Sequence, residues 1–176
     1  MKNLFFTTII ISLFLVSCGG AKDKLKDLIK AETAETALDY NDDLIAIQAE
    51  VDNSIVDLLN VIDGSDPVEM EDARTSTLKI IKNAISDVED MRDFDGKDDY
   101  KKAMIKLLKM YEDIVKNELT DIIDLVGYTE ELTDDDWLKY EELYDSALAK
   151  YDAAFTEFDA FQDGFADKWD FTINRN

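Results

Sequence analysis

Residues 37–62 read ALDYNDDLIAIQAEVDNSIVDLLNVI, and this stretch decides the fold. Its inward positions alternate by four and three residues, the spacing of one helix face packed at a shallow angle on its neighbours. That face consists of Ala37, Asn41, Leu44, Gln48, Val51, Ile55, Leu58 and Ile62. The stretch therefore predicts a long amphipathic helix, which we place at residues 22–63.

The remaining chain repeats this pattern between clear start and stop signals. Asp66 and Pro67 suit the N-cap and the first helical position, and Thr133 with the acidic run 134–136 suits another helix start. Helices are expected at residues 22–63, 67–93, 98–126 and 134–170. Four amphipathic helices joined by short loops predict an all-α, antiparallel up-down-up-down four-helix bundle.

The first and last of these helices are longer than the middle two. In an up-down bundle their extensions, Lys22 to Ala34 and Asp163 to Phe171, lie at the same end. We therefore expect a two-helix, membrane-proximal stem. Its contacts are predicted between Leu25, Leu28 and Ile29 on one side and Phe165, Trp169 and Phe171 on the other.

The first residues have the pattern of an export signal. Lys2 precedes the run Leu4 to Val16, which is apolar apart from three hydroxyl residues and too short to span a bilayer as a lasting helix. The run ends in Leu15-Val16-Ser17-Cys18, which resembles the lipobox of bacterial lipoproteins. The resemblance implies a signal peptide at residues 1–17, cleavage before Cys18, and acylation (such as palmitate) of the Cys18 thiol and of the new amine. An ordinary secretory signal with a chance cysteine, or with a buried structural one, is the alternative.

Location and tether follow from the same resemblance. Residues 18–21 are expected to form the lipidated cysteine and a short tether, and residues 22–176 the helical domain. Gly19 in place of aspartate favours the outer membrane, with the domain attached through the lipid on Cys18. Whether the domain faces the cell surface or the periplasm stays open.

Composition excludes several classes of function. The formal net charge is −22, which repels nucleic acid phosphates, so no nucleic acid partner is expected. The chain has no histidine, and Cys18 is its only cysteine. The usual general base, zinc ligands and nucleophile pairs are therefore missing, and we expect neither an enzyme nor a cofactor.

Three polar residues stand at positions expected to be buried: Asn41, Gln48 and Gln162. A buried polar side chain needs a hydrogen-bond partner, so these residues either fix the helix register or line a polar ligand pocket. We favour register, with Tyr151 or Gln162 as the partner on the last helix. The pocket near Asn41 and Gln48 remains the alternative.

Two short pieces of the chain also resemble a sparsely characterised family of helical surface lipoproteins of spirochaetes and Bacteroidota. The first piece is Tyr40-Asn41-Asp42 with Ile45 and Gln48. The second is Phe161-Gln162, Phe165-Ala166 and Trp169-Asp170-Phe171. The resemblance implies a helical, exported domain and brings no catalytic residue or cofactor.

Two further patterns have a structural and a functional interpretation. Asp93, Asp95 and Asp98 suggest a calcium loop, but alignment on Gly96 puts unsuitable residues at the first and last ligand positions, so an acidic turn is preferred. The aromatic row of the last helix, from Trp137 to Trp169, is expected to be core; a sugar- or lipid-binding face is the alternative.

These observations together predict a lipid-anchored, non-enzymatic envelope or surface protein. It is expected to mediate binding or assembly with an envelope or extracellular protein or polymer. The alternative is a binding protein for a small ligand or for calcium.

Overall fold

The computed structural model describes residues 20–64, 66–127 and 131–173, with side chains described from Thr36 onward. Within this part the secondary structure is helical, apart from one isolated bridge between Phe94 and Lys97. The helices are α1 (Gly20–Ile62), α2 (Pro67–Asp90), α3 (Asp99–Lys116), α4 (Glu118–Gly127) and α5 (Asp134–Trp169). The all-α prediction is confirmed, and four helical rods, one of them α3 with α4, pack against each other.

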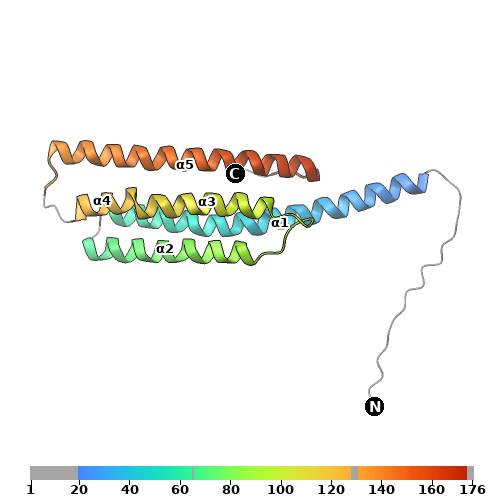
Figure 1. Cartoon of the computed structure of the whole chain (residues 1–176), viewed down its shortest axis with the longest axis horizontal. Helices are drawn as coiled ribbons and strands as arrows, with labels where there is room; N and C mark the ends of the chain where they lie inside the picture. Colours follow the sequence, from blue (N-terminus) through green and yellow to red (C-terminus); the bar gives the residue numbers. More distant parts are fainter. Residues whose placement is uncertain (1–19, 65, 128–130, 174–176) are drawn as a thin grey trace, which may run out of the picture.

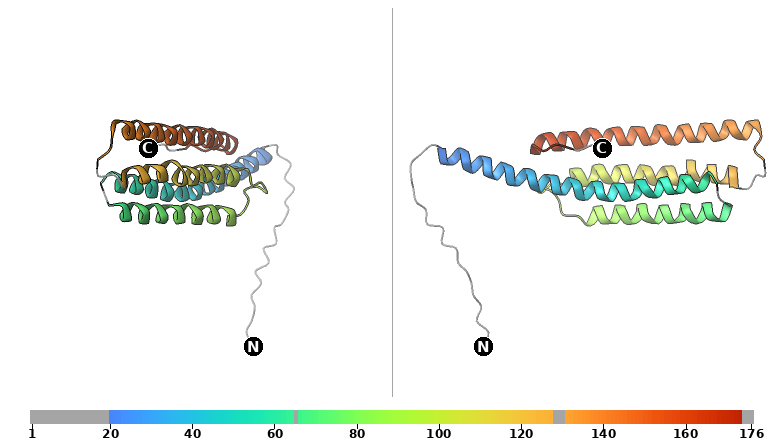
Figure 2. Two further views of the ribbon diagram at one scale, coloured as in Figure 1. Left: turned by 60° about the vertical axis from the view of Figure 1, so that its left-hand side comes forward. Right: turned by 180° about the vertical axis from the view of Figure 1, so that it is seen from behind.

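The rods lie side by side (Figures 1 and 2). The end of α1, the start of α2, the end of α4 and the start of α5 meet at one end of the molecule. At the other end, the first part of α1 continues beyond the remaining helices. None of the helices in the described ranges is long and apolar enough to cross a membrane.

Both predicted helix starts are confirmed by their caps. The Asp66 carboxylate accepts hydrogen bonds from the backbone N–H groups of Val68 (2.9 Å) and Glu69 (3.1 Å), and Pro67 opens α2. At α5, the Thr133 hydroxyl accepts from the N–H of Asp136 (3.3 Å), while the Asp136 carboxylate accepts from the N–H of Thr133 (2.9 Å). These bonds satisfy N–H groups that lack a partner inside the helix.

The prediction of one continuous helix at 98–126 is wrong, because the helix is interrupted at Asn117. Its backbone (φ −109°, ψ −84°) leaves the helical region, and α4 begins at the next residue. Local bonds hold the break: the Asn117 amide donates to Asp113 (2.7 Å), and the Thr120 hydroxyl donates to the carbonyl of Val115 (2.9 Å). The break leaves Glu118 buried, where it meets Lys150 of α5.

Two predicted boundaries also shift. α2 ends at Asp90 instead of residue 93, because Phe94 and Lys97 exchange backbone hydrogen bonds (3.0 and 3.1 Å) across a turn with positive φ at Asp95 and Gly96. α1 begins at Gly20, inside the stretch 18–21 assigned to a tether, because alanine, lysine and leucine that follow favour a helix.

The core lies mainly between α1, α2 and α3 with α4. The predicted face of α1 is buried except at Ile55, which is partly exposed, and Leu44, Val51 and Leu58 are wholly enclosed. In contrast, the buried hydrophobic residues of α5 are Ala147, Phe158 and Ala166. Apart from Phe158, its larger side chains are only partly covered, and most of the exposed large apolar residues of the described chain lie on α5.

Candidate binding site

A buried polar cluster joins α1, α3 and α5. The side-chain oxygen Oδ1 of Asn41 accepts hydrogen bonds from the Tyr100 hydroxyl (2.6 Å) and from Nε2 of Gln162 (2.8 Å). All three residues are buried. Asn41 and Gln162 are thus brought together as the register interpretation expects, and side chains with satisfied bonds occupy this position.

Gln48 lies apart from that cluster. It is buried, and its Nε2 donates to Oδ2 of Asp52 at 3.3 Å. Burial raises the pKa of Asp52, and the neighbouring Tyr111 and Gln48 partly offset this rise. Within the described residues, Oδ1 of Asp52 and the hydroxyl of Tyr111 are both enclosed without a hydrogen-bond partner.

Asp52 lies at the edge of a hollow between α1 and α5, which we call the α1/α5 groove. Its volume is about 220 Å³ and its lining is mostly apolar, including Val56 and Leu59 of α1 and Leu148 and Tyr151 of α5. The rings of Tyr111 and Tyr151 stack at 5.4 Å between centroids. The groove therefore combines rigid aromatic walls with one carboxylate whose hydrogen bonds are incomplete.

An exposed apolar stripe on α5 continues beyond this groove. Trp137, Tyr144, Leu148 and Phe155 expose 53, 40, 43 and 37% of their surface. At 3.6 residues per turn, their spacing of seven, four and seven places them within about 40° of one line along the helix. We call these four residues the α5 stripe.

The prediction that the whole aromatic row is core is therefore wrong for part of it. Phe158 is buried, and Tyr151, Phe161 and Phe165 pack against the core. The stripe residues lie on a neighbouring face of α5. Sequence periodicity did not separate the two faces, because a packed face and an exposed heptad face have the same spacing.

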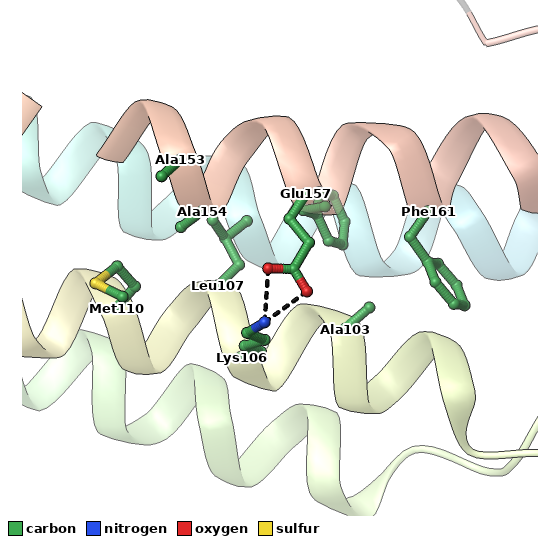
Figure 3. Close-up of a pocket in the computed structure, with 9 residues that line it drawn as sticks. Ala103, Lys106, Leu107, Met110, Ala153, Ala154, Glu157 and Phe161 are labelled. Carbon is green, nitrogen blue, oxygen red and sulfur yellow. Dashed lines mark hydrogen bonds and ion pairs between the residues drawn. The ribbon is translucent and has the colours of Figure 1, made fainter. Parts of the chain in front are cut away.

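A second groove of about 270 Å³ lies on the other flank of α5, against α3 (Figure 3). The Nζ atom of Lys106 bonds both carboxylate oxygens of Glu157 at 2.5 and 2.6 Å across it. Both side chains are exposed, so the pair contributes little to stability. This ion pair spans the groove, whereas the charged residue that lines the α1/α5 groove, Asp52, has no ion-pair partner among the described residues.

A third hollow, of about 460 Å³, lies at the end of the bundle where α5 finishes. There Phe94 packs against Phe165 (5.3 Å) and Trp169 (5.1 Å), and Lys168 lies 4.4 Å from the Trp169 ring. Phe171 contacts Phe165 as well. Two of the aromatic residues assigned to the stem, Phe165 and Trp169, therefore pack against Phe94 in the α2–α3 connection, while the side chains of Leu25, Leu28 and Ile29 lie outside the described residues.

Two of the three carboxylates of the acidic turn form ion pairs with lysine. Asp93 pairs with Lys101 and Asp98 with Lys102, each at 2.9 Å, and Asp95 occupies the turn itself. In the described ranges, no group of three or more acidic, histidine or cysteine residues could hold a metal ion. In the turn, Asp93 and Asp98 are paired with lysines and Asp95 is exposed to solvent.

Comparison with known proteins found no relative: no protein-family model, curated protein or solved structure matches the chain. Cys18 and the lipobox-like residues lie outside the described residues. The segments around Tyr40-Asn41-Asp42 and around Phe161-Gln162 meet in the structure, since Asn41 bonds Gln162 and the rings of Tyr40 and Phe165 lie 6.4 Å apart.

The sequence interpretation missed Asp52 and the α5 stripe. Asp52 follows Gln48 by one helical turn, and a carboxylate so close to a buried position was a usable signal. Leu138 and Leu148 are apolar residues outside the predicted aromatic row, so they signalled that α5 has more apolar surface than one packed face requires.

Proposed function

We propose that this chain is a lipid-anchored, non-enzymatic protein of the bacterial cell envelope, held at the outer membrane, that binds or assembles with another envelope or extracellular component. The observation that carries the binding role is the α5 stripe, which presents large apolar side chains to solvent on a strongly acidic protein. An apolar surface of this extent marks an interaction site more often than it serves stability.

The anchor in this proposal is the lipid on Cys18, at the end of the signal-like run. The helices keep an antiparallel, up-down-up-down order, and the membrane-proximal stem consists of the end of α5 and the part of α1 that precedes Thr36. Those sixteen helical residues, Gly20 to Glu35, extend about 24 Å at 1.5 Å per residue. The stem thus acts as a spacer between the membrane and the bundle.

Metabolic labelling with a palmitate analogue tests the anchor. The wild-type chain is expected to take up label, and Cys18→Ser is expected to lose it entirely, since no other cysteine is present. Equal labelling of both proteins, or an unlabelled wild type released into the aqueous phase of a detergent partition, contradicts the anchor.

Protease treatment of intact cells then locates the domain, with a periplasmic protein as the control for cell integrity. Loss of the domain from intact cells places it on the surface, and protection places it in the periplasm. Either outcome is compatible with binding, but the class of partner differs between them.

A second candidate is a binding protein for a small ligand or for calcium. The α1/α5 groove, lined by Asp52 beside Gln48, favours the small-ligand version of this candidate. A ligand at a hundred times its dissociation constant adds about 2.7 kcal/mol to the free energy of unfolding. Thermal melting with and without calcium therefore detects the calcium version, and an unchanged melting temperature removes it.

A further inference from the structure

The α1/α5 groove and the α5 stripe form one continuous surface because Tyr144 and Leu148 belong to both. Trp137 and Phe155, at the two ends of the stripe, are eighteen residues apart, or about 27 Å along the helix. A small molecule in a groove of about 220 Å³ covers only the middle of this length. The surface therefore matches an elongated occupant.

The spacing of the stripe indicates what shape that occupant has. Residues spaced by seven, four and seven are the knobs that a helix presents to a partner helix in a shallow crossing. Tyr151 stacks on Phe155 (5.9 Å between ring centroids), and Tyr140 stacks on Tyr144 (6.4 Å). These contacts restrain Phe155 and Tyr144, the two stripe residues involved. Restrained side chains lose less entropy on binding, which favours contact.

The charge around this surface indicates the chemistry of the occupant. The sequence has no lysine or arginine between Lys30 and Arg74, so the bundle part of α1 carries acidic charges alone. On α5, Glu141, Asp145 and Asp152 lie within about 80° of the stripe at 100° per residue. Lys150 lies on the opposite side of α5, paired with Asp113 (2.6 Å) and Glu118 (2.8 Å).

We propose that the α1/α5 groove and the α5 stripe bind a basic amphipathic helix of a partner protein. Its apolar face covers the stripe, and one of its cationic side chains reaches the carboxylate of Asp52. This inference rests on the proposed binding function and names its surface and partner class. A second copy of this chain is disfavoured as the occupant, because it brings two acidic faces together.

The test uses the full chain in nanodiscs of phosphatidylcholine, with empty nanodiscs as the blank, and three synthetic peptides of about three heptads. The first has leucine on one face and lysine on the other. The second has the same composition in scrambled order, and the third has glutamate in place of lysine. We expect the first to bind at least about tenfold more tightly than the scrambled peptide, and the acidic peptide not to bind.

Neutral substitutions localise the binding. Val56→Gln and Leu148→Gln are expected to weaken binding of the basic amphipathic peptide about fivefold each, the effect of a central contact residue. Val68→Gln on α2 is the matched control: Val68 is exposed to 69%, against 54% for Val56, and lies outside the groove, so no change is expected. Asp52→Asn is expected to weaken binding and to reduce its dependence on salt.

Three results overturn the proposal. Equal affinity for the scrambled peptide shows that charge alone attracts the helix, and equal loss in Val68→Gln shows that the groove is not the site. Self-association of the peptide-free protein that Leu148→Gln abolishes assigns the stripe to a second copy. Uptake of the chain into nanodiscs and palmitate labelling report on the anchor on Cys18, whereas the peptide titrations report on the groove, so failure of one is distinguishable from failure of the other.

Discussion

Asn41→Leu is expected to destabilise the bundle several times more than Tyr100→Phe, although both remove the same 2.6 Å hydrogen bond. In Asn41→Leu, the buried Tyr100 hydroxyl and the buried Gln162 amide both lose their acceptor. An unsatisfied buried donor costs about 1–3 kcal/mol, so the two together cost about 2–6 kcal/mol. In Tyr100→Phe, Oδ1 of Asn41 keeps its bond from Gln162, and the expected loss is only about 0.5–1.5 kcal/mol.

Urea unfolding followed by far-ultraviolet circular dichroism measures both losses, and thermal melting provides a second reading. For a domain of this size, each kcal/mol lowers the melting temperature by about 2–4 °C. The triple variant Asn41→Leu, Tyr100→Phe, Gln162→Leu removes the acceptor and both donors together. We expect it to recover most of the stability that Asn41→Leu loses, because no polar group is left without a partner.

A loss in Asn41→Leu no larger than that in Tyr100→Phe refutes the reasoning, because Asn41 is then not the shared acceptor. The same follows if the triple variant is less stable than Asn41→Leu alone. Leucine has the branched shape of asparagine but a larger volume, so Asn41→Leu opens no cavity and can overpack the site. The triple variant carries the same leucine at residue 41, so its recovery relative to Asn41→Leu reports polar satisfaction and not packing at that residue.

Three further variants test the electrostatics and the caps. Asp52→Asn is expected to raise the melting temperature at neutral pH: burial raises the pKa of Asp52 in the folded state, so stability falls as pH rises through the unfolded value of 3.8, and the gain disappears in melts well below that pH. Lys150→Met is expected to cost about 1–3 kcal/mol in urea unfolding at neutral pH, less than a fully buried pair because the lysine is partly exposed. Burial alone raises the pKa of Glu118, but hydrogen bonds from Lys150 and from Ser146 lower it overall, so the effect of Lys150→Met should shrink as pH falls from 4.5; a constant effect contradicts the pairing. Thr133→Ala is expected to cost about 1 kcal/mol by loss of the cap of α5, and an unchanged midpoint of unfolding excludes a contribution from this cap.

Features decided by neighbouring residues could be predicted from the sequence. The starts of α2 and α5 follow from Asp66, Pro67 and Thr133, whose side chains or rings act within one turn of the chain. The buried face of α1 followed from spacing alone. The contact of Asn41 with Gln162 was foreseeable as one of two options, although 121 residues separate them, because few polar residues stand on inward positions.

Features decided by packing could not be predicted in this way. The helix break at Asn117 allows Glu118 to contact Lys150 of α5. No local sequence pattern predicts that contact. The α5 stripe has heptad spacing, and heptad spacing does not distinguish a face covered by this chain from one that solvent reaches. Which of the two apolar faces of α5 is covered depends on where the other helices lie, and the spacing within α5 does not encode that.

The size of the α5 stripe links binding to anchoring. Its four side chains are about half exposed, so covering them adds about 1 kcal/mol each, or about 4 kcal/mol in total. The free-energy cost of association in solution is of this order, so covering the stripe alone gives weak binding. The acidic surroundings must supply the remaining affinity, which makes the binding dependent on salt. A partner confined to the same membrane surface meets the groove at a much higher effective concentration. Under the proposed anchor, a stem of about 24 Å then fixes how far from the membrane the partner helix must lie to engage α5.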